Sequence, residues 1–303
     1  MLDTWDWYTK LAEKSSFTKA AESLGMSQQT LSARLAALER ELEAKLVVRG
    51  NPLQFTPAGM AFLVYARDQQ QAQQDMLRQI GEVTGGGGGV LKVGIAHMRS
   101  RTLAPRVVKE LSRVLPGVTL QLVEGTNREL TRMAERGEVD AVVARFSSSH
   151  PGVNVEPLYQ EEVVLAVQRE LLEATLGMPA ERVLAKVAEE GLAVVGELPL
   201  VLGTVDDISG RIAYSELRNA GIRPRTIAVS ENMATLLAMA AEGIGAVFAP
   251  NAALDATSGM TGTLVRIPLS AQATYTICVG LPMKAEHWSV LDTFTEVLKN
   301  AVK

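Results

Sequence analysis

The stretch from Phe17 to Leu42 constrains the fold more than any other, because it has the pattern of two short helices joined by a tight turn. Thr18 is the predicted N-cap of the first helix, Gly25 ends it, and Ser27 is the predicted N-cap of the second. Leucines recur in the second helix with the period of one apolar face, at Leu31, Leu35, Leu38 and Leu42. Two capped helices around a glycine turn indicate a helix-turn-helix.

The opposite face of the second helix is predicted to be small, polar and nearly uncharged. The residues expected on that face and its flanks are Gln29, Thr30, Ser32, Ala33, Arg34 and Ala36. Such a face fits a DNA major groove, because a glutamine amide can bridge N6 and N7 of adenine and an alanine can contact a thymine methyl group. We therefore predict Gln29 as the main base-reading residue. If the helix pair is considered alone, the alternative is that the second helix is an ordinary amphipathic surface helix whose polar face contacts only solvent.

The next segment, residues 46–59, predicts a wing. Two short extended runs flank turn-forming residues, and Thr56 then caps a helix that has Pro57 at its first position. The whole sequence SFTKAAESLGMSQQTLSARLAALERELEAKLVVRGNPLQFTPAG resembles, nearly position for position, the N-terminal winged helix-turn-helix of LysR-type transcriptional regulators. The residues expected to contact DNA are Thr18, Lys19, Ser27, Gln28, Gln29, Thr30, Ser32, Arg34 and Arg49.

The charge of this part is nearly neutral, since residues 1–84 contain nine basic and ten acidic side chains. DNA binding must then depend on local placement, chiefly of Lys19, Arg34 and Arg49, and on more than one copy per complex. We expect weak, salt-sensitive binding by a single module.

A long helical pattern follows, and then five consecutive glycines. The helix carries an apolar stripe that it cannot bury alone, so it is expected to pair with a second copy, and the resemblance implies the same dimerisation helix. The glycines follow a helix and precede a strand, the reverse of a dinucleotide-binding loop, and so predict a hinge. We expect a DNA-binding domain over 1–58, a linker and dimerisation helix over 59–84, the hinge over 85–89 and an effector-binding domain over 90–303.

Residues 90–303 alternate strand and helix twice over, which predicts parallel sheets covered on both faces. Motifs such as LPGVTLQLVEGTNRELTRMAERGEVDAVVAR and AAEGIGAVFAP resemble the LysR effector domain, and imply an α/β fold of two lobes like a periplasmic binding protein. We place the first lobe at 90–160 and 269–303 and the second at 161–268. The charged segment 168–198 is longer than the family pattern and predicts one long helix.

Ligands of α/β sheets bind where strands end and helices begin. The residues expected there are His97, Met98, Arg99, Ser100, Arg145, Phe146, Thr204, Asp206, Asn232 and Met233. An anionic small molecule would be favoured by Arg99, Arg101 and Arg145. The alternative is that these arginines face solvent or a neighbouring subunit. Family members often carry Ser or Thr where this chain has Ala96, His97 and Met98, so the effector's identity cannot be carried over.

Several classes of protein are excluded by what the sequence lacks. An N-terminus with acidic residues is no secretion signal, and no run of about eighteen apolar residues predicts a membrane span. The single Cys278 and three scattered histidines predict neither a disulfide nor a metal site. There is no nucleophile elbow, phosphate loop or carboxylate pair backed by a histidine, so no enzyme and no cofactor are expected.

The sequence thus predicts a cytoplasmic, sequence-specific transcriptional regulator. Its expected partners are double-stranded DNA with a near-palindromic operator, a small-molecule effector bound between the lobes, and further copies of the chain in a dimer or tetramer; RNA polymerase is another candidate. Two alternatives stay open: a small-molecule sensor with weak or vestigial DNA binding, which the neutral N-terminal charge favours, and an architectural DNA binder that ignores ligand.

Overall fold

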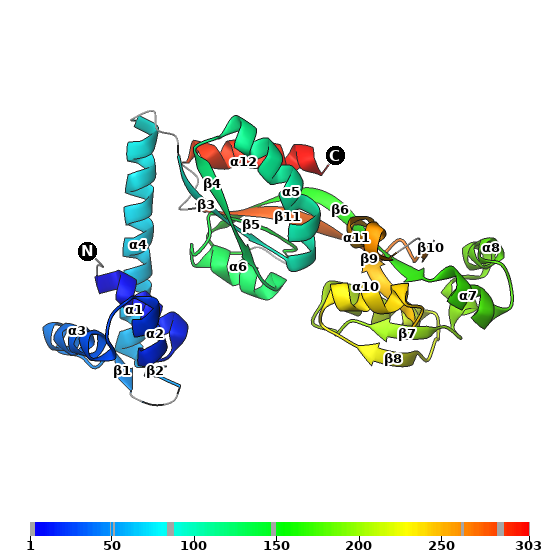
Figure 1. Cartoon of the computed structure of the whole chain (residues 1–303), viewed down its shortest axis with the longest axis horizontal. Coiled ribbons are helices and arrows are strands. Elements are labelled where there is room, and N and C mark those ends of the chain that lie inside the picture. Colours follow the sequence, from blue (N-terminus) through cyan, green and yellow to red (C-terminus); the bar gives the residue numbers. More distant parts are fainter. Residues whose placement is uncertain are drawn as a thin grey trace. The chain divides into compact units, whose positions relative to one another are not determined.

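The computed structural model describes residues 4–48, 50, 52–83, 88–146, 150–261, 264–283 and 288–302. The chain divides into two compact units, Met1–Gly89 and Val90–Lys303 (Figure 1). Among the described residues, no helix combines the length and the apolar character that a membrane crossing requires.

The N-terminal unit is a winged helix-turn-helix with a long final helix. Its elements are α1 (Thr4–Lys14), α2 (Phe17–Ser23), α3 (Gln28–Glu41), β1 (Val47–Val48), β2 (Gln54–Phe55) and α4 (Pro57–Val83). Strands β1 and β2 pair antiparallel and form the base of the wing. The core is formed by side chains from the helices and the wing, among them Trp7, Tyr8, Leu11, Ala20, Leu31, Leu35, Leu46 and Leu63.

Two expectations for the helix pair were wrong in detail. The N-cap of α2 is Ser16, whose backbone is extended, and the helix therefore includes Phe17 and Thr18. Leu42 follows the last residue of α3 and is 43% exposed, so it does not belong to the buried stripe. The N-cap at Ser27 is confirmed, because its Oγ accepts a hydrogen bond from the backbone N–H of Thr30 at 3.1 Å.

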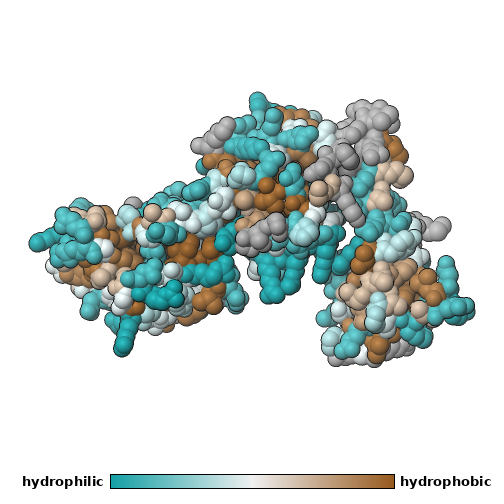
Figure 2. Space-filling view, turned by 180° about the vertical axis from the view of Figure 1, so that it is seen from behind, coloured by the Kyte–Doolittle hydropathy of each residue, from teal (hydrophilic) through white to brown (hydrophobic). Residues whose placement is uncertain are grey.

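Only the first turns of α4 pack on the core of this unit. Leu63 and Ala66 are buried there. Other apolar side chains of α4 are exposed: Val64 and Tyr65 beside them, and Met76, Leu77 and Ile80 further along the helix. In Figure 2 apolar surface, coloured brown, interrupts the polar surface of this unit. Within the described residues of the N-terminal unit, these apolar side chains of α4 are therefore left uncovered.

The second unit is α/β. Its elements up to the first crossing strand are β3 (Gly89–Ile95), α5 (His97–Val114), β4 (Val118–Glu124), α6 (Asn127–Glu135), β5 (Ala141–Ala144) and β6 (Val153–Val167). The next are α7 (Arg169–Leu176), α8 (Ala180–Glu190), the 3₁₀ helix η1 (Leu192–Val195), β7 (Pro199–Leu202), α9 (Ile208–Asn219), β8 (Arg225–Val229) and α10 (Met233–Ala241). The last are β9 (Ala246–Pro250), α11 (Asn251–Thr261), β10 (Val265–Ile267), β11 (Thr274–Pro282) and α12 (Ser289–Ala301).

Two lobes share one continuous sheet. In the described part of the chain the strand order is β4-β3-β5-β11-β6-β9-β7-β8, and β10 also pairs with β6. The pairs β3 with β5, β7 with β8 and β7 with β9 are parallel, as predicted. The long strands β6 and β11 instead run antiparallel to each other and connect the lobes. Strand β6 is also antiparallel to β9, and β11 is antiparallel to β5.

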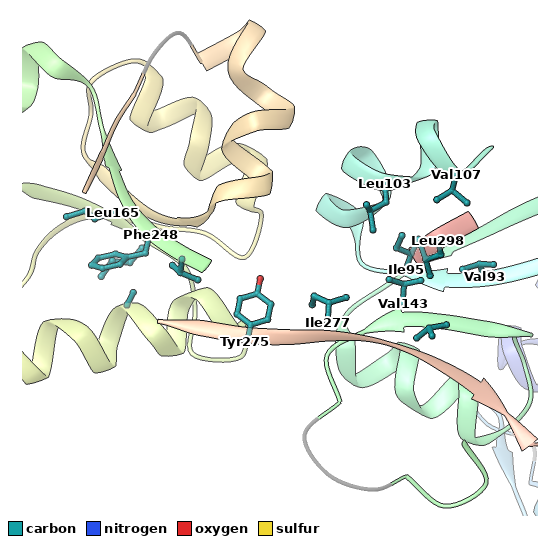
Figure 3. Packing of buried hydrophobic residues seen from close by; sticks show 14 of the residues in the cluster. Val93, Ile95, Leu103, Val107, Val143, Leu165, Phe248, Tyr275, Ile277 and Leu298 are labelled. Carbon is teal, nitrogen blue, oxygen red and sulfur yellow. The ribbon is translucent and has the colours of Figure 1, made fainter. Parts of the chain in front are cut away.

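The buried apolar cluster of this unit extends along β11 from one lobe into the other (Figure 3). Val93, Ile95 and Val143 lie in one lobe, and Leu165 and Phe248 lie in the other. Tyr275 and Ile277 of β11 lie between these two groups (Figure 3). The crossing strands thus carry side chains into the region where the lobes meet.

Helix boundaries differ from expectation at two places. The sequence pattern predicts a helix from Leu103 to Leu115, but α5 begins at His97, so the polar turn before Leu103 is also helical. The single helix expected in the segment 168–198 is two helices, because Gly177 adopts a left-handed conformation that ends α7, and Pro179 precedes α8. Helix α11, which follows β9 directly, was not predicted.

Candidate DNA-binding face and inter-lobe cavity

Helices α2 and α3 present a polar face to solvent. Thr18, Lys19, Gln28, Gln29 and Thr30 are all exposed on it. The Thr18 hydroxyl donates a hydrogen bond to Oε1 of Gln28 at 3.3 Å, which connects the two helices at this face. In the described part of the chain Gln29 makes no side-chain hydrogen bond, so its amide is available for a base edge.

The other residues predicted to contact DNA lie at the edges of this face. Ser27 and Thr30 share a hydrogen bond between their hydroxyl oxygens at 2.8 Å. Ser32 and Arg34 are half-buried on the flanks of α3. Arg49 lies outside the described residues.

Glu39 positions the wing, a role that the sequence analysis missed. It is 9% exposed. Its Oε1 accepts the backbone N–H groups of Leu46 at 2.9 Å and Val47 at 3.4 Å, and its Oε2 accepts Nζ of Lys45 at 2.7 Å. Burial opposes the charge, but these donors outweigh it and lower the pKa of Glu39. The sequence feature that could have identified Glu39 is its position four residues after Leu35, on the buried side of α3.

A cavity of about 80 Å³ lies between the two lobes of the second unit. The first turns of α5, α9, α10 and α11 line it, together with Asn127 and residues of β6 and β11. The lining residues are Ala96, Met98, Arg99, Thr102, Asn127, Glu161, Asp207, Ile208, Ser209, Met233, Pro250, Ala253 and Tyr275. Of the ten residues predicted to bind the effector, Met98, Arg99 and Met233 are among them.

Arg99 forms the polar centre of this cavity and is 8% exposed. Its Nη2 donates to Oε2 of Glu161 at 3.0 Å, and its Nε donates to the Tyr159 hydroxyl at 3.2 Å. Nη1 has no hydrogen-bond partner among the described residues. Burial disfavours the charged guanidinium, but the neighbouring Tyr159, Glu161 and Tyr275 more than compensate and raise the pKa of Arg99. Arg99 is therefore a buried cation whose charge is matched by one carboxylate.

Tyr275 and Glu161 face each other across the crossing strands, because their Cα atoms are paired in the β6–β11 ladder. Burial first, and then the Glu161 carboxylate, raise the pKa of Tyr275 well above its ordinary value. The phenol is therefore neutral at physiological pH. The sequence shows both residues in strands, but it does not show the register that brings them to Arg99.

The remaining predicted effector residues lie outside the lining of the cavity. His97 is exposed, with its Nε2 at 3.8 Å from Oε2 of Glu124, and Ser100 is buried. The backbone N–H of Arg145 donates to Oδ1 of Asn127 at 3.1 Å, and Phe146 packs edge-on against His150. Further residues outside the lining are Thr204, Asp206 and Asn232, the last of which caps α10.

The three arginines that favoured an anionic effector are not gathered at the cavity. Arg99 lines it, Arg101 is exposed and Arg145 is half-buried outside the lining. Asp207, next to the predicted Asp206, lines the cavity instead. Within the described residues, no group of three or more His, Cys, Asp or Glu side chains could hold a metal ion.

Comparison with known proteins matches both units. The model of the bacterial regulatory helix-turn-helix protein, lysR family, matches residues 2–60, and the model of the LysR substrate binding domain matches residues 84–303. The HTH-type transcriptional regulator YcgK of Bacillus subtilis is 31% identical over 257 residues, which cover 81% of this chain and 78% of YcgK. A probable hydrogen peroxide-inducible genes activator of Mycobacterium avium is 27% identical over 249 residues, 82% of this chain and 76% of that protein.

Solved structures share the fold. The crystal structure of CbnR, a LysR family transcriptional regulator, is similar with a TM-score of 0.66 and 22% identity, covering 100% of this chain and 99% of CbnR. Full-length CbnR complexed with its target DNA gives a TM-score of 0.64 at 22% identity, covering 99% of each chain. With both units matched, the chain belongs to the LysR family and is a DNA-binding transcriptional regulator with an effector-binding domain.

Proposed function

We propose that this regulator reads a near-palindromic operator as a dimer or a tetramer, and that a small molecule in the inter-lobe cavity controls it. The observation that carries the DNA part is the exposed polar face of α2 and α3, backed by the buried leucines of α3. In this proposal residues 1–58 read DNA, 59–84 dimerise and 90–303 bind the effector, with the lobe boundaries given above.

Dimerisation through α4 is supported by its exposed apolar side chains, among them Val64, Leu77 and Ile80. A helix of this length that leaves such residues exposed gains free energy when it packs against a second copy. Two DNA-reading helices in one complex then reach two half-sites, which compensates for the neutral charge of each module. CbnR, a relative by fold, has been crystallised with its target DNA.

Effector control is supported by the position of the cavity. A ligand there would contact α5 of one lobe and α9 and α10 of the other. The lobes are connected by the strands β6 and β11, so such a ligand would favour one angle between the lobes over another. The ligand acts on DNA binding only if it binds one of these states more tightly.

We propose neither an enzymatic activity nor peroxide sensing for this chain. The matched relatives are named as regulators of transcription. Peroxide oxidises exposed thiolates, but Cys278 is the chain's single cysteine, it is buried in β11, and burial raises the pKa of its thiol. A regulator of this kind works where the chromosome is, in the cytoplasm, and RNA polymerase is a candidate partner.

The experiment that tests this function is a selection of genomic fragments by the purified full-length protein at moderate salt, repeated with scrambled competitor DNA. We expect an enriched near-palindromic motif with half-sites one or two helical turns apart. The genes beside that motif would then nominate effectors. A selection without any enriched motif would contradict the proposal and favour a small-molecule sensor with vestigial DNA binding.

A further inference from the structure

We infer that the effector is a small zwitterion that carries both a carboxylate and an ammonium group, as a free amino acid does. This inference rests on the proposed function, in which the inter-lobe cavity is the effector site. It replaces the plain anion that the sequence favoured.

The charges that line the cavity disfavour a plain anion. Arg99 is the one basic residue of the lining, and Glu161 and Asp207 are its two carboxylates. The Arg99 guanidinium is already paired with Glu161 at 3.0 Å. An added anion would therefore enter a partly buried site whose lining already has a net negative charge, and such a transfer is costly.

The donors for a carboxylate lie at one end of the cavity, at the start of α5. The N-cap of this helix is Ala96, which has no side chain to accept from the first-turn N–H groups. Nη1 of the buried Arg99, in the same turn, has no hydrogen-bond partner among the described residues. Backbone N–H groups at a helix N-terminus together with a guanidinium N–H form a site for a carboxylate.

Helices α9 and α10, which also begin at the cavity, are already capped. Oδ2 of Asp207 accepts the N–H groups of Ser209 at 2.8 Å and Gly210 at 3.4 Å, which satisfies the start of α9. Oδ1 of Asn232 accepts the N–H groups of Ala234 and Thr235, which satisfies the start of α10. The carboxylate of a ligand is thereby directed to α5 rather than to α9 or α10.

Asp207 supplies the site for the ammonium group. Within the part of the chain that the structure describes, its Oδ1 accepts no hydrogen bond, although Asp207 lines the cavity. Asp207 is also close enough to the neutral Tyr275 to contribute to the raised pKa of that phenol. An ammonium group at Oδ1 would neutralise the excess negative charge of the lining.

The cavity also limits the size of the ligand. At about 80 Å³ it is small beside the roughly 300–1,000 Å³ of sites for drug-sized molecules. Met98, Ile208 and Met233 give it apolar walls. A short, apolar side chain on the zwitterion fits these walls.

The experiment compares matched sets of three compounds against the full-length protein, by thermal shift and then by titration calorimetry. Each set holds an amino acid, the acid that lacks its amino group and the amine that lacks its carboxylate; alanine, propionate and ethylamine form one set, and leucine, 4-methylpentanoate and 3-methylbutylamine another. We expect at least one amino acid to raise the melting temperature while its two partners leave it unchanged. An acid that stabilises as well as its amino acid, or a full panel of amino acids without effect, would overturn the inference. The result of the operator selection, which tests the proposed function, does not depend on the outcome of this ligand test.

A variant pair locates the ammonium site. Asparagine is as good an N-cap as aspartate, so Asp207→Asn keeps α9 capped while it removes the charge. We expect it to weaken binding of the amino acid about ten- to a hundredfold, as the loss of one charge-assisted hydrogen bond does, and to improve binding of the deaminated acid. The matched change Asp206→Asn, at the exposed neighbour outside the lining, should alter neither affinity. Unchanged affinity in Asp207→Asn would place the ammonium group elsewhere and overturn the assignment of Asp207.

Discussion

At the scale of single residues, Glu39 shows how one carboxylate connects two elements of the DNA-binding unit. Because its pKa is lowered on folding, it stabilises the fold above the ordinary pKa of 4.5, and this stabilisation is lost as the pH falls through its lower folded-state pKa. We expect Glu39→Gln to cost about 1–2 kcal/mol near neutral pH, through weaker bonds to the N–H groups of Leu46 and Val47.

Urea denaturation of the full-length protein from about pH 7 to about pH 3 checks this, with Trp5 and Trp7 of α1 as fluorescent reporters. The difference between wild type and Glu39→Gln should shrink toward the acid end. Glu41→Gln, an exposed carboxylate in the same turn of α3, serves as the control and should change stability by less than about 0.5 kcal/mol. A difference that stays constant down to low pH would show that the charge of Glu39 is not what stabilises the wing.

Gln29 is the residue at which base reading can be separated from phosphate binding. Its exposed amide predicts a loss of about 1–3 kcal/mol for Gln29→Ala at a half-site that contains adenine, and a smaller loss on scrambled DNA. Lys19→Ala should weaken binding to both DNAs alike and reduce the salt dependence, as expected for a phosphate contact. Fluorescence anisotropy with the selected and the scrambled duplex measures both. Equal losses of affinity for Gln29→Ala on the two duplexes would show that Gln29 does not read bases.

At the scale of elements, the start of α4 packs too closely on the wing to accept a side chain at Gly59. A Cβ there would lie 1.9 Å from the backbone oxygen of Leu46, and the Tyr8 hydroxyl donates to the Gly59 carbonyl at 3.0 Å. We expect Gly59→Ala to destabilise the N-terminal unit by about 1–3 kcal/mol or more, because a backbone atom must move.

The control is the same substitution in another helix. Gly259 of α11 has nothing within 4 Å of an added Cβ, so Gly259→Ala should leave stability unchanged or raise it by up to about 1 kcal/mol through helix propensity. Thermal unfolding of both variants measures the contrast. Equal effects of the two substitutions would mean that α4 does not approach the wing this closely.

Elements were predictable from the sequence where periodicity and caps agree, whereas only Met98, Arg99 and Met233 of the predicted effector residues line the cavity. Helix α3 and the parallel strands follow from the local pattern, as does the N-cap at Ser27. The early start of α5 was missed because its first turn is polar and faces the cavity rather than a core. Glu161 and Tyr275 reach Arg99 through the register of β6 and β11, and register between strands this far apart in the chain is set by tertiary packing.

At the scale of the whole molecule, two units with separate cores must be coupled for an effector to change DNA binding. Each unit has its own buried cluster, one of which includes Tyr8 and Leu31 and the other Ile95 and Phe248. Because the DNA-binding module has almost no net charge, we expect a single copy to bind DNA weakly. In the proposed assembly through α4, an effector would change the distance between two such modules rather than the affinity of each module.

This gives a prediction for the exposed stripe of α4. Leu77 is 59% exposed, and Leu77→Glu would place two carboxylates in the dimer contact, where their desolvation and repulsion disfavour pairing. We expect light scattering to show dissociation, and affinity for the full operator to fall about a hundredfold or more as the second module is lost. Gln71→Glu adds the same charge on the side of α4 that faces away from Leu77 and Ile80, and should keep both properties. A Leu77→Glu protein that remains a dimer and binds the operator as tightly as wild type would mean that the modules are paired by another surface, and that the stripe on α4 has a different partner.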